Sequence, residues 1–252
     1  ELPNNLINAL ISTEDIRYKS HSGIDVRSLA RAVFGLIYGE TNSGGASTIT
    51  QQLAKMLFTE KPSTGIERVM QKFKEWVIAI RLEKQYTKDE ILTMYLNRFD
   101  WVNNAVGIKS AAQVYFNKKP EELITEESAM LVGMLKNPAL YNPNRRIELT
   151  TERRNVVLSQ MNKYEFIPDS LYDTLKKKAI ILDFKRASHN EGLAPYFREH
   201  LRGELKNWCT KNLKPDGDPY NLYTDGLRIY TTINSRMQKF AEEGITTHIS
   251  AL

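Results

Sequence analysis

Three groups of polar residues in the first third of the chain have types and spacings that could carry chemistry. The first is the carboxylate pair Glu14 and Asp15, and the second is the run 44–52, which reads Gly-Gly-Ala-Ser-Thr-Ile-Thr-Gln-Gln. The third is Lys72 with Glu75. A carboxylate in the first group, a cradle of hydroxyls and amides in the second, and a second carboxylate beside a lysine in the third together suit the transfer of a sugar from a phosphate leaving group.

Glu14 follows an apolar stretch of helical spacing, where partial burial would suit a general base, and Asp15 beside it could hold a basic side chain. A helix cap or a surface charge is the commoner role for such residues. His21, which precedes Gly23, could move a proton or bind a ligand, although a structural hydrogen bond is the commoner role of a single histidine. Both interpretations stay open from the residues alone.

The second group predicts a loop that runs into a helix, with Ser47 or Thr48 as the N-cap. A helix start of this kind offers free N–H groups to a pyrophosphate. One stripe of this helix carries a hydroxyl, two amides and an ammonium, at i, i+3, i+4 and i+7: Thr48, Gln51, Gln52 and Lys55. A capped helix with a solvated polar face would explain the same pattern.

The third group lies on a predicted helix over 65–85, where Lys72 and Glu75 share one face with Arg68. A solvated, salt-bridged face would account for these residues equally well. The other face of this helix is apolar over roughly 120°, through Ile66, Val69, Met70, Phe73, Trp76, Val77 and Ile80.

Composition narrows the function classes only a little. The chain has 252 residues, 41% of them hydrophobic, and a formal charge of +5 that would attract phosphates or a headgroup surface. No apolar run approaches the roughly 18 residues that span a bilayer, and the single Cys209 excludes an internal disulfide. The sequence has no metal-ligand spacing of histidines, no Walker-type loop, no acyl-transfer Ser-x-x-Lys motif and no nucleic-acid pattern.

The periodicity is helical almost throughout up to residue 163, and the expected helices lie near 26–39, 48–58, 65–85, 87–97, 126–136 and 149–163. Beyond residue 165 the pattern changes. It predicts strands at 179–184 and 227–233 and a helix near 194–212. The sequence therefore predicts a mainly α domain over 1–164, followed by a small α+β module over 165–252.

Five blocks in order resemble the peptidoglycan glycosyltransferase family, the polymerase domain of class A, bifunctional penicillin-binding proteins. The resemblance covers roughly residues 8–161, and the blocks lie at 14–23, 47–55, 72–75, 91–97 and 111–116. Pro138, Tyr141 and Arg154 resemble the family's later pattern. In one departure, Gln71 stands where the family usually has an arginine, which removes one cation from the phosphate site.

The resemblance implies a mainly α, lysozyme-like fold with a small membrane-facing lobe between the first and third blocks. It implies a transferase that polymerises lipid II into β-1,4-linked glycan, with inversion and release of undecaprenyl pyrophosphate. Glu14 resembles the base that deprotonates the acceptor hydroxyl. Glu75 resembles the second essential carboxylate, which assists departure of the pyrophosphate directly or through a divalent cation (Mg or Mn), with no cofactor strictly required. The remaining substrate-binding positions are Asp15, Ser47, Thr48, Gln51, Gln52, Lys55 and Lys72.

The partners implied by the resemblance are lipid II, the growing glycan chain, the inner-membrane surface and phosphoglycolipid inhibitors of the moenomycin type. The implied location is the outer face of the bacterial cytoplasmic membrane, with an N-terminal anchor expected upstream. Segments 194–197 and 225–233 resemble the linker to a transpeptidase domain, so a bifunctional protein is expected. Val33, Phe34, Leu36, Ile37, Tyr38 and the run 56–58 are candidates for membrane contact, with burial in the core as the alternative.

Two rival functions share these features. A lysozyme-like hydrolase or lytic transglycosylase would share the helical fold and Glu14, but cleavage has no pyrophosphate that would need Glu75 and the lysines. A non-catalytic scaffold that binds lipid II or division proteins would not need both glutamates.

Overall fold

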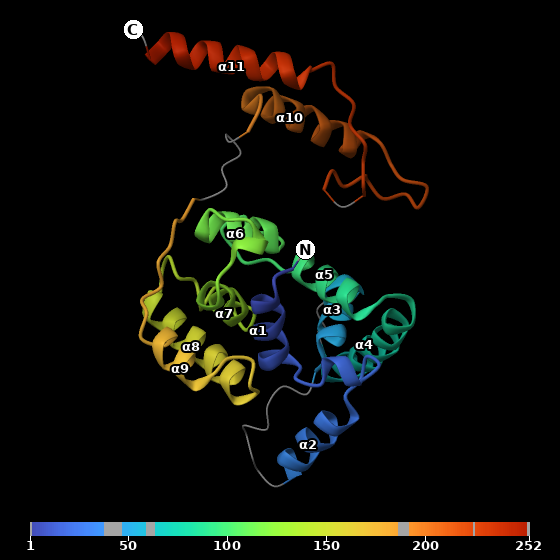
Figure 1. Ribbon diagram of the computed structural model, residues 1–252. Helices are drawn as coiled ribbons and strands as arrows, with labels where there is room; N and C mark the ends of the chain where they lie inside the picture. Colours follow the sequence, from blue (N-terminus) through green and yellow to red (C-terminus); the bar gives the residue numbers. More distant parts are fainter. Residues whose placement is uncertain (1, 38–46, 59–63, 186–191, 224, 251–252) are drawn as a thin grey trace. The chain divides into compact units, whose positions relative to one another are not determined.

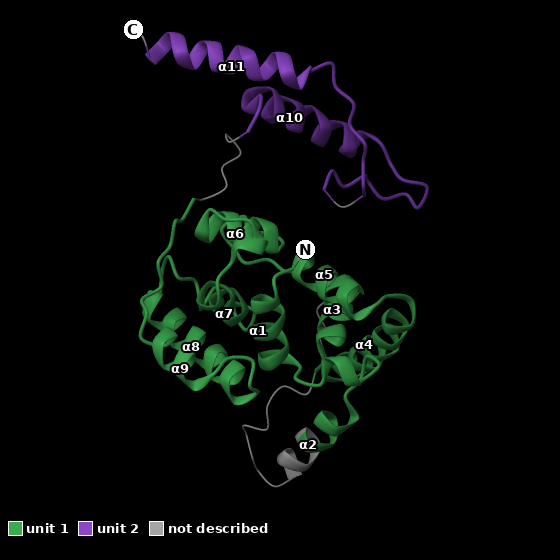
Figure 2. Ribbon diagram, viewed as in Figure 1, with its two compact units in different colours: residues 1–186 green, residues 187–252 purple. Residues whose placement is uncertain are grey.

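The computed structural model describes residues 2–37, 47–58, 64–185, 192–223 and 225–250, with the backbone alone for 32–37. It divides into two compact units, residues 1–186 and 187–252 (Figure 2). The mainly helical fold class predicted from the sequence is confirmed.

Unit 1 is built from helices (Figure 1). In chain order they are α1 (Asn4–Glu14), η1 (Tyr18–Ser20), α2 (Val26–Ile37), α3 (Ile49–Phe58), α4 (Gly65–Gln85), α5 (Lys88–Arg98), α6 (Ile108–Phe116), η2 (Pro120–Glu122), α7 (Thr125–Met134), α8 (Ile147–Lys163) and α9 (Asp169–Leu175). The six helices expected from the periodicity correspond to α2, α3, α4, α5, α7 and α8, and residues 38–39 of the first lie outside the described part. From the sequence, α1 is expected only as an apolar stretch of helical spacing, and no separate helix is predicted at α6 or α9. α1 packs on α7 and α8, while α3 packs on α4 and α5.

Local sequence fixes the starts of the two helices that follow α3. Thr64 and Thr87 are N-caps of α4 and α5, and each accepts a hydrogen bond from a glutamate N–H three residues later. The side chains of these glutamates, Glu67 and Glu90, return to the N-cap N–H and complete a capping box in both cases. α4 and α5 therefore begin where the sequence satisfies their free N–H groups.

The core of unit 1 is apolar and includes residues from both sets of packed helices, α1 with α7 and α8, and α3 with α4 and α5. Leu6 and Leu10 of α1, Leu53 of α3, Leu96 of α5 and Leu158 of α8 are fully buried. Burying such a side chain contributes about 1.5–3 kcal/mol relative to leaving it exposed. α1, which ends at Glu14, is therefore held against α7 and α8 by buried apolar side chains.

α4 buries the face that its sequence pattern would place outward. The buried residues of this helix are Glu75, Ala79 and Leu82, whereas its apolar stripe is exposed: Ile66 80%, Val69 55%, Met70 55%, Phe73 53%, Val77 52% and Ile80 37%. A helix in a soluble domain normally turns its apolar stripe to the core. These six residues form the exposed stripe of α4. Because the stripe does not pack in the core, packing within the domain does not account for its apolar character.

Unit 2 consists mainly of two helices, α10 (Pro195–Lys211) and α11 (Ser235–Ser250). α10 begins with a proline at its first position, which suits a helix start because the missing N–H would be unsatisfied there. Its buried residues include Cys209, which forms no disulfide. Most of the large apolar side chains of unit 2 are exposed, as for Tyr196, Tyr230 and Phe240.

The small α+β module predicted from residue 165 onward is wrong in its β component. Residues 179–184 and 227–233 form no strand, and the described parts of the chain contain only two isolated bridges, Asp100 with Val106 and Leu213 with Pro219. Alternating sequence favours an extended backbone, but a strand also needs a neighbour to pair with. Neither segment has one among the described residues. The domain boundary at 164/165 stays a prediction.

Candidate functional site

Glu14 is the last residue of α1, and its carboxylate meets α3. Gln52 Nε2 donates to Glu14 Oε2 at 3.0 Å, and Tyr95 of α5 donates from its hydroxyl to Gln52 Oε1 at 3.0 Å. Glu14 and Gln52 are half-buried and Tyr95 is buried. Burial raises the pKa of Tyr95 well above its ordinary value, and the nearby charge of Glu14 raises it further. Tyr95 therefore stays a hydrogen-bond donor, and the chain Tyr95–Gln52–Glu14 fixes this carboxylate.

Asp15, the residue after Glu14, is buried. It accepts a hydrogen bond from the N–H of Ile49 at 3.0 Å and contacts His21 Nε2 at 2.9 Å. The N–H of Gly23 donates to His21 Nδ1 at 3.2 Å, so the ring hydrogen is on Nε2. Nε2 therefore donates the hydrogen bond to Asp15. Asp15 holds a basic side chain, as the sequence suggested, and His21 has the structural role. The role of Asp15 in substrate binding stays a prediction.

Thr48 is the N-cap of α3 and ties the helix to the first block. Its hydroxyl accepts from the N–H of Gln51 at 3.1 Å and donates to the carbonyl of Gly23 at 2.7 Å. The Gly23 backbone has φ +94°, and a Cβ there would lie 2.8 Å from the backbone of Ala79 on α4. Glycine is therefore required where the loop crosses α4.

The start of α3 differs from its expected role as a cradle of free N–H groups. The N–H of Ile49 is taken by Asp15 and that of Gln51 by Thr48. Thr48 and Gln51 are buried, which excludes a solvated polar face for these two residues. Their role in substrate binding stays a prediction. Gln52 points to Glu14, while Lys55 is exposed. Within the expected stripe, Thr48 and Gln51 are therefore buried, whereas Gln52 and Lys55 remain accessible.

Glu75 of α4 is 2% exposed, which excludes a solvated face for this residue. Lys72 Nζ lies 2.9 Å from Glu75 Oε2 and donates to Ser47 Oγ at 3.0 Å. Glu75 Oε2 accepts no hydrogen bond from the residues described, so its contact with Lys72 is that of an ion pair. The lysine is itself 46% exposed. The structure therefore joins the second and third blocks through one accessible ammonium.

Two supporting positions were missed in the sequence. Tyr95 lies in the fourth block, 91–97, which carried the resemblance without a role for this residue. Glu83 accepts from Thr50 at 2.6 Å and pairs with Lys88 at 2.7 Å, and Lys88 donates to the carbonyl of His21 at 2.7 Å. These contacts hold α3, α4 and the first block together. A single sequence carries no signal for pairs so far apart in the chain.

The site thus offers a half-buried carboxylate held by an amide, and a buried carboxylate paired with an accessible ammonium. The first could accept a proton from a hydroxyl nucleophile. The second, with Ser47, could face a leaving group that gains negative charge. No group of three or more His, Cys, Asp or Glu suited to a metal ion occurs within the described ranges.

Comparison with known proteins adds independent evidence. A family model described as Transglycosylase matches residues 1–162. Penicillin-binding protein 1A of Escherichia coli (strain K12) is 36% identical over 249 residues, which cover 99% of this chain and 28% of that protein. Penicillin-binding protein 2D of Bacillus subtilis (strain 168) is 33% identical over 246 residues, covering 98% and 34% respectively.

Among solved structures, Penicillin-binding protein 1A from Haemophilus influenzae matches with a TM-score of 0.41 and 28% identity, over 77% of this chain and 24% of that chain. The chain spans about three tenths of the length of the curated relatives it matches. The family match covers every residue of the three chemical blocks. The chain therefore belongs to the transglycosylase family of peptidoglycan glycosyltransferases.

Proposed function

We propose that this chain polymerises lipid II into β-1,4-linked glycan with inversion at the anomeric carbon and release of undecaprenyl pyrophosphate. The observation that carries the proposal is that the two carboxylates have different partners. Glu14 accepts a hydrogen bond from Gln52, whereas Glu75 forms an ion pair with Lys72. Their environments suit two different tasks in one displacement. The lipid II donor and the growing glycan chain follow from the family and are part of this proposal.

Glu14 is the proposed general base. Its Oε2 is occupied by Gln52, and the side chain is half-buried, so a sugar hydroxyl can approach the carboxylate. Removal of the proton from the acceptor 4-hydroxyl allows its oxygen to attack the anomeric carbon of the donor. The bond to the pyrophosphate breaks on the opposite face, which gives inversion. The fixed position of the carboxylate lowers the entropic cost of this step.

Lys72 and Ser47 are the proposed contacts of the departing pyrophosphate. Lys72 is held between Glu75 and Ser47, so its charge is positioned before the substrate arrives. A preorganised cation stabilises charge that develops in the transition state. Glu75 would then act mainly by orienting Lys72. Lys55 is an accessible second cation on α3.

A divalent cation remains a prediction from the resemblance. Mg²⁺ is commonly bound by one or two carboxylates together with substrate phosphates. Glu75 has a buried oxygen without a hydrogen bond, but that oxygen is already paired with Lys72, and the described residues build no dedicated metal site around it. The steps proposed here need no metal ion.

Contact with the inner-membrane surface is part of the same proposal. Besides the exposed stripe of α4, two apolar side chains at the end of α3 are exposed: Leu57 at 39% and Phe58 at 61%. Exposed apolar patches of this kind mark interaction sites. The candidate side chains at 33–38 lie outside the described part of the structure. No described helix is long and apolar enough to cross a membrane.

The remaining expectations concern the longer relatives. An upstream anchor, a transpeptidase domain, location at the outer face of the cytoplasmic membrane and inhibition by phosphoglycolipids of the moenomycin type are proposals by analogy with the family.

The deciding experiment is polymerisation of lipid II by this chain, compared with Glu14→Gln and Glu75→Gln. We expect Glu14→Gln to lower the rate by about 10²–10⁴-fold, the usual contribution of a general acid or base. Glu75→Gln should lower it by about 10²–10³-fold, because Lys72 loses the partner that orients it toward the leaving group. Glu152→Gln, an exposed position on α8, is the matched control and should keep full activity. Unchanged rates in folded Glu14→Gln would overturn the assignment. Release of muropeptides from soluble peptidoglycan would support the hydrolase instead.

A further inference from the structure

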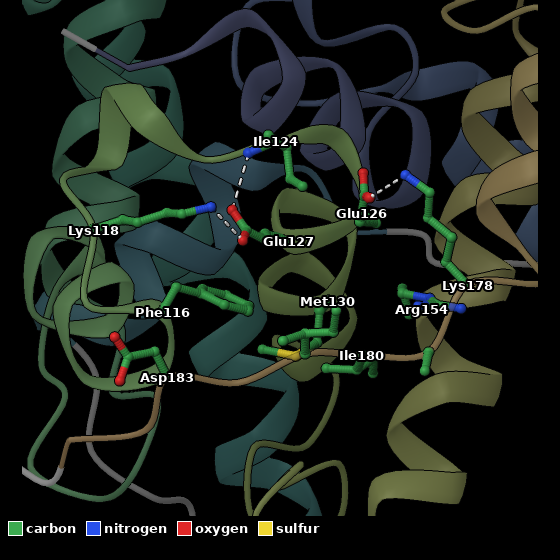
Figure 3. Close-up of a pocket in the computed structure, with 12 residues that line it drawn as sticks. Phe116, Lys118, Ile124, Glu126, Glu127, Met130, Arg154, Lys178, Ile180 and Asp183 are labelled. Atoms are coloured by element: carbon green, nitrogen blue, oxygen red, sulfur yellow. Dashed lines mark hydrogen bonds and ion pairs between the residues drawn. The ribbon is translucent and has the colours of Figure 1, made fainter.

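A pocket with a volume of about 690 Å³ lies in unit 1. Its walls come from the end of α6, the start of α7, the middle of α8 and the extended segment 178–183. Figure 3 shows apolar side chains on several sides, among them Phe116, Met130 and Ile180. Phe116 is 4% exposed and Met130 is fully buried. None of the residues in the three chemical blocks lines this pocket.

Arg154 forms part of the pocket wall and is fully buried. Its Nε and Nη2 donate to Asn155 Oδ1 at 3.1 and 2.9 Å, and Nη2 also reaches the carbonyl of Lys176 at 3.4 Å. Nη1 has no hydrogen-bond partner among the residues described. A buried donor without a partner costs about 1–3 kcal/mol, and more when the group is charged. The wall of the pocket therefore includes a charged donor group, Arg154 Nη1, whose hydrogen bonds are not satisfied by the described residues.

No carboxylate of the pocket wall forms an ion pair with Arg154 among the described residues. Lys118 pairs with Glu127 at 2.6 Å and Lys178 pairs with Glu126 at 3.0 Å, as the dashed lines of Figure 3 show. Among the described residues, the hydrogen-bond acceptors of the guanidinium are neutral oxygens. Burial lowers the pKa of Arg154 and the charge of Glu126 raises it again, but an arginine remains charged in proteins. Asp183, the third carboxylate of the pocket wall, accepts a hydrogen bond from Asn117 Nδ2 at 3.0 Å. The charged guanidinium of Arg154 is therefore buried without a carboxylate partner among the described residues.

The extended segment adds a second feature. Among the described residues, no backbone hydrogen bond involves residues 179–184; Lys185 makes the next one, to Val114, at 2.8 Å. An extended backbone with free N–H and C=O groups can pair with another extended chain. One wall of the pocket therefore offers backbone contacts next to the buried guanidinium.

We propose that this pocket binds an organic carboxylate carried on an apolar group. The carboxylate accepts from Arg154 Nη1, and the apolar group lies against Phe116, Met130 and Ile180. This ligand class supplies both missing elements, a negative charge for the buried cation and apolar surface for the walls. It has two possible sources, a small carboxylate and the carboxyl end of an extended peptide. The peptide would additionally pair with the segment 179–183.

N-acetylphenylalanine and its neutral amide are matched probes, because they have nearly the same size and only the first carries a carboxylate. We expect the acid to bind this chain at least about tenfold more tightly, as for a hydrogen bond to a charged group. The site is checked by ¹³C-methyl NMR of the methionines, of which there are seven. Met130 lines the pocket and should shift, whereas the exposed Met70 and Met237 should not.

Two variants separate the site from a general effect on folding. Ile180→Trp should fill the pocket and weaken the acid at least about tenfold, since it adds volume without removing the guanidinium. Val156→Trp, on an exposed position of α8, is the control and should leave binding unchanged. Arg154→Met should remove the preference for the acid over the amide, provided that its NMR spectrum remains that of a folded chain.

A pentapeptide that ends in phenylalanine with a free carboxylate distinguishes the two sources. Tighter binding than N-acetylphenylalanine would assign a peptide end, and equal binding would assign a small carboxylate. Equal affinity of acid and amide, or a Met130 resonance that does not move, would overturn the proposal.

Discussion

The amide of Gln52 donates to the carboxylate of Glu14 across 3.0 Å. The direction of this bond is set from the other side, because the hydroxyl of Tyr95 donates to the amide oxygen of Gln52. An amide whose oxygen is occupied by a donor must present its NH₂ group to the next partner. Tyr95 is therefore a positioning residue that acts on Glu14 through Gln52.

A double-mutant cycle tests this chain of contacts. We expect Gln52→Ala to lower the polymerisation rate by about 10–100-fold and Tyr95→Phe by about tenfold, because loss of orientation misplaces the base. The double variant should be no slower than Gln52→Ala alone, since both changes break the same chain. Rates that multiply instead would show that Tyr95 acts independently of Gln52. Tyr196→Phe, at an exposed hydroxyl, is the control.

Thr48 gives a prediction about stability. Thr48→Val removes the cap of α3 and the bond to the Gly23 carbonyl, so the free energy of unfolding should fall by about 1–3 kcal/mol. Thr48→Ser keeps the hydroxyl and should retain most of the stability. Urea unfolding of the three proteins measures the difference. If Thr48→Val is as stable as the parent, the cap does not hold the loop.

The helices could be predicted from the sequence because their information is local. Periodicity and the capping residues Thr64 and Thr87 define α4 and α5 without knowledge of the rest of the fold. The orientation of α4 could not be predicted in this way. A helical pattern separates two faces, but it does not say which face meets protein and which meets another medium.

The site shows the same division. The residue types of Glu14, Glu75 and Lys72 suggested their chemistry, and the structure joins Lys72 to both Glu75 and Ser47. The bond from Tyr95 to Gln52 spans 43 positions of the chain and has no local pattern. The strands predicted at 179–184 and 227–233 failed for a related reason, because pairing depends on a distant partner.

Alkaline pH should destabilise the fold through its buried tyrosines. Burial raises the pKa of Tyr115 to about 12, with a smaller contribution from Asp100, while the bond from Asn103 opposes the shift. The unfolded tyrosine has a pKa of about 10. The unfolded chain therefore loses this proton first, and stability present below pH of about 10 should be lost as the pH rises through about 12.

The same direction holds for Tyr18 and Tyr95, whose pKa values are raised further, mainly by burial. Urea unfolding between about pH 9 and 12 measures the slope. Tyr115→Phe should make the slope shallower, whereas Tyr196→Phe should leave it unchanged. A parent protein with constant stability over this range would contradict the prediction.

The exposed stripe of α4 predicts binding to lipid vesicles. Phe73 is 53% exposed in the protein and would be buried in the bilayer on binding. Phe73→Asp should therefore lower the fraction of protein that floats with phosphatidylethanolamine and phosphatidylglycerol vesicles, with about tenfold weaker binding. Phe58→Asp should act in the same direction. Tyr196→Asp, an exposed aromatic in unit 2, is the matched control. Equal flotation of Phe73→Asp and the control would remove the stripe from the membrane contact.

The inverted packing of α4 has a consequence for the depth at which the reaction takes place. Glu75 and the exposed stripe lie on opposite sides of one helix, and a helix with its side chains is about 10–12 Å thick. If the stripe rests at the acyl boundary, Glu75 lies about one helix diameter above it, at the level of the lipid headgroups. A lipid-linked donor could then present its pyrophosphate to Lys72 while its hydrocarbon tail stays in the bilayer.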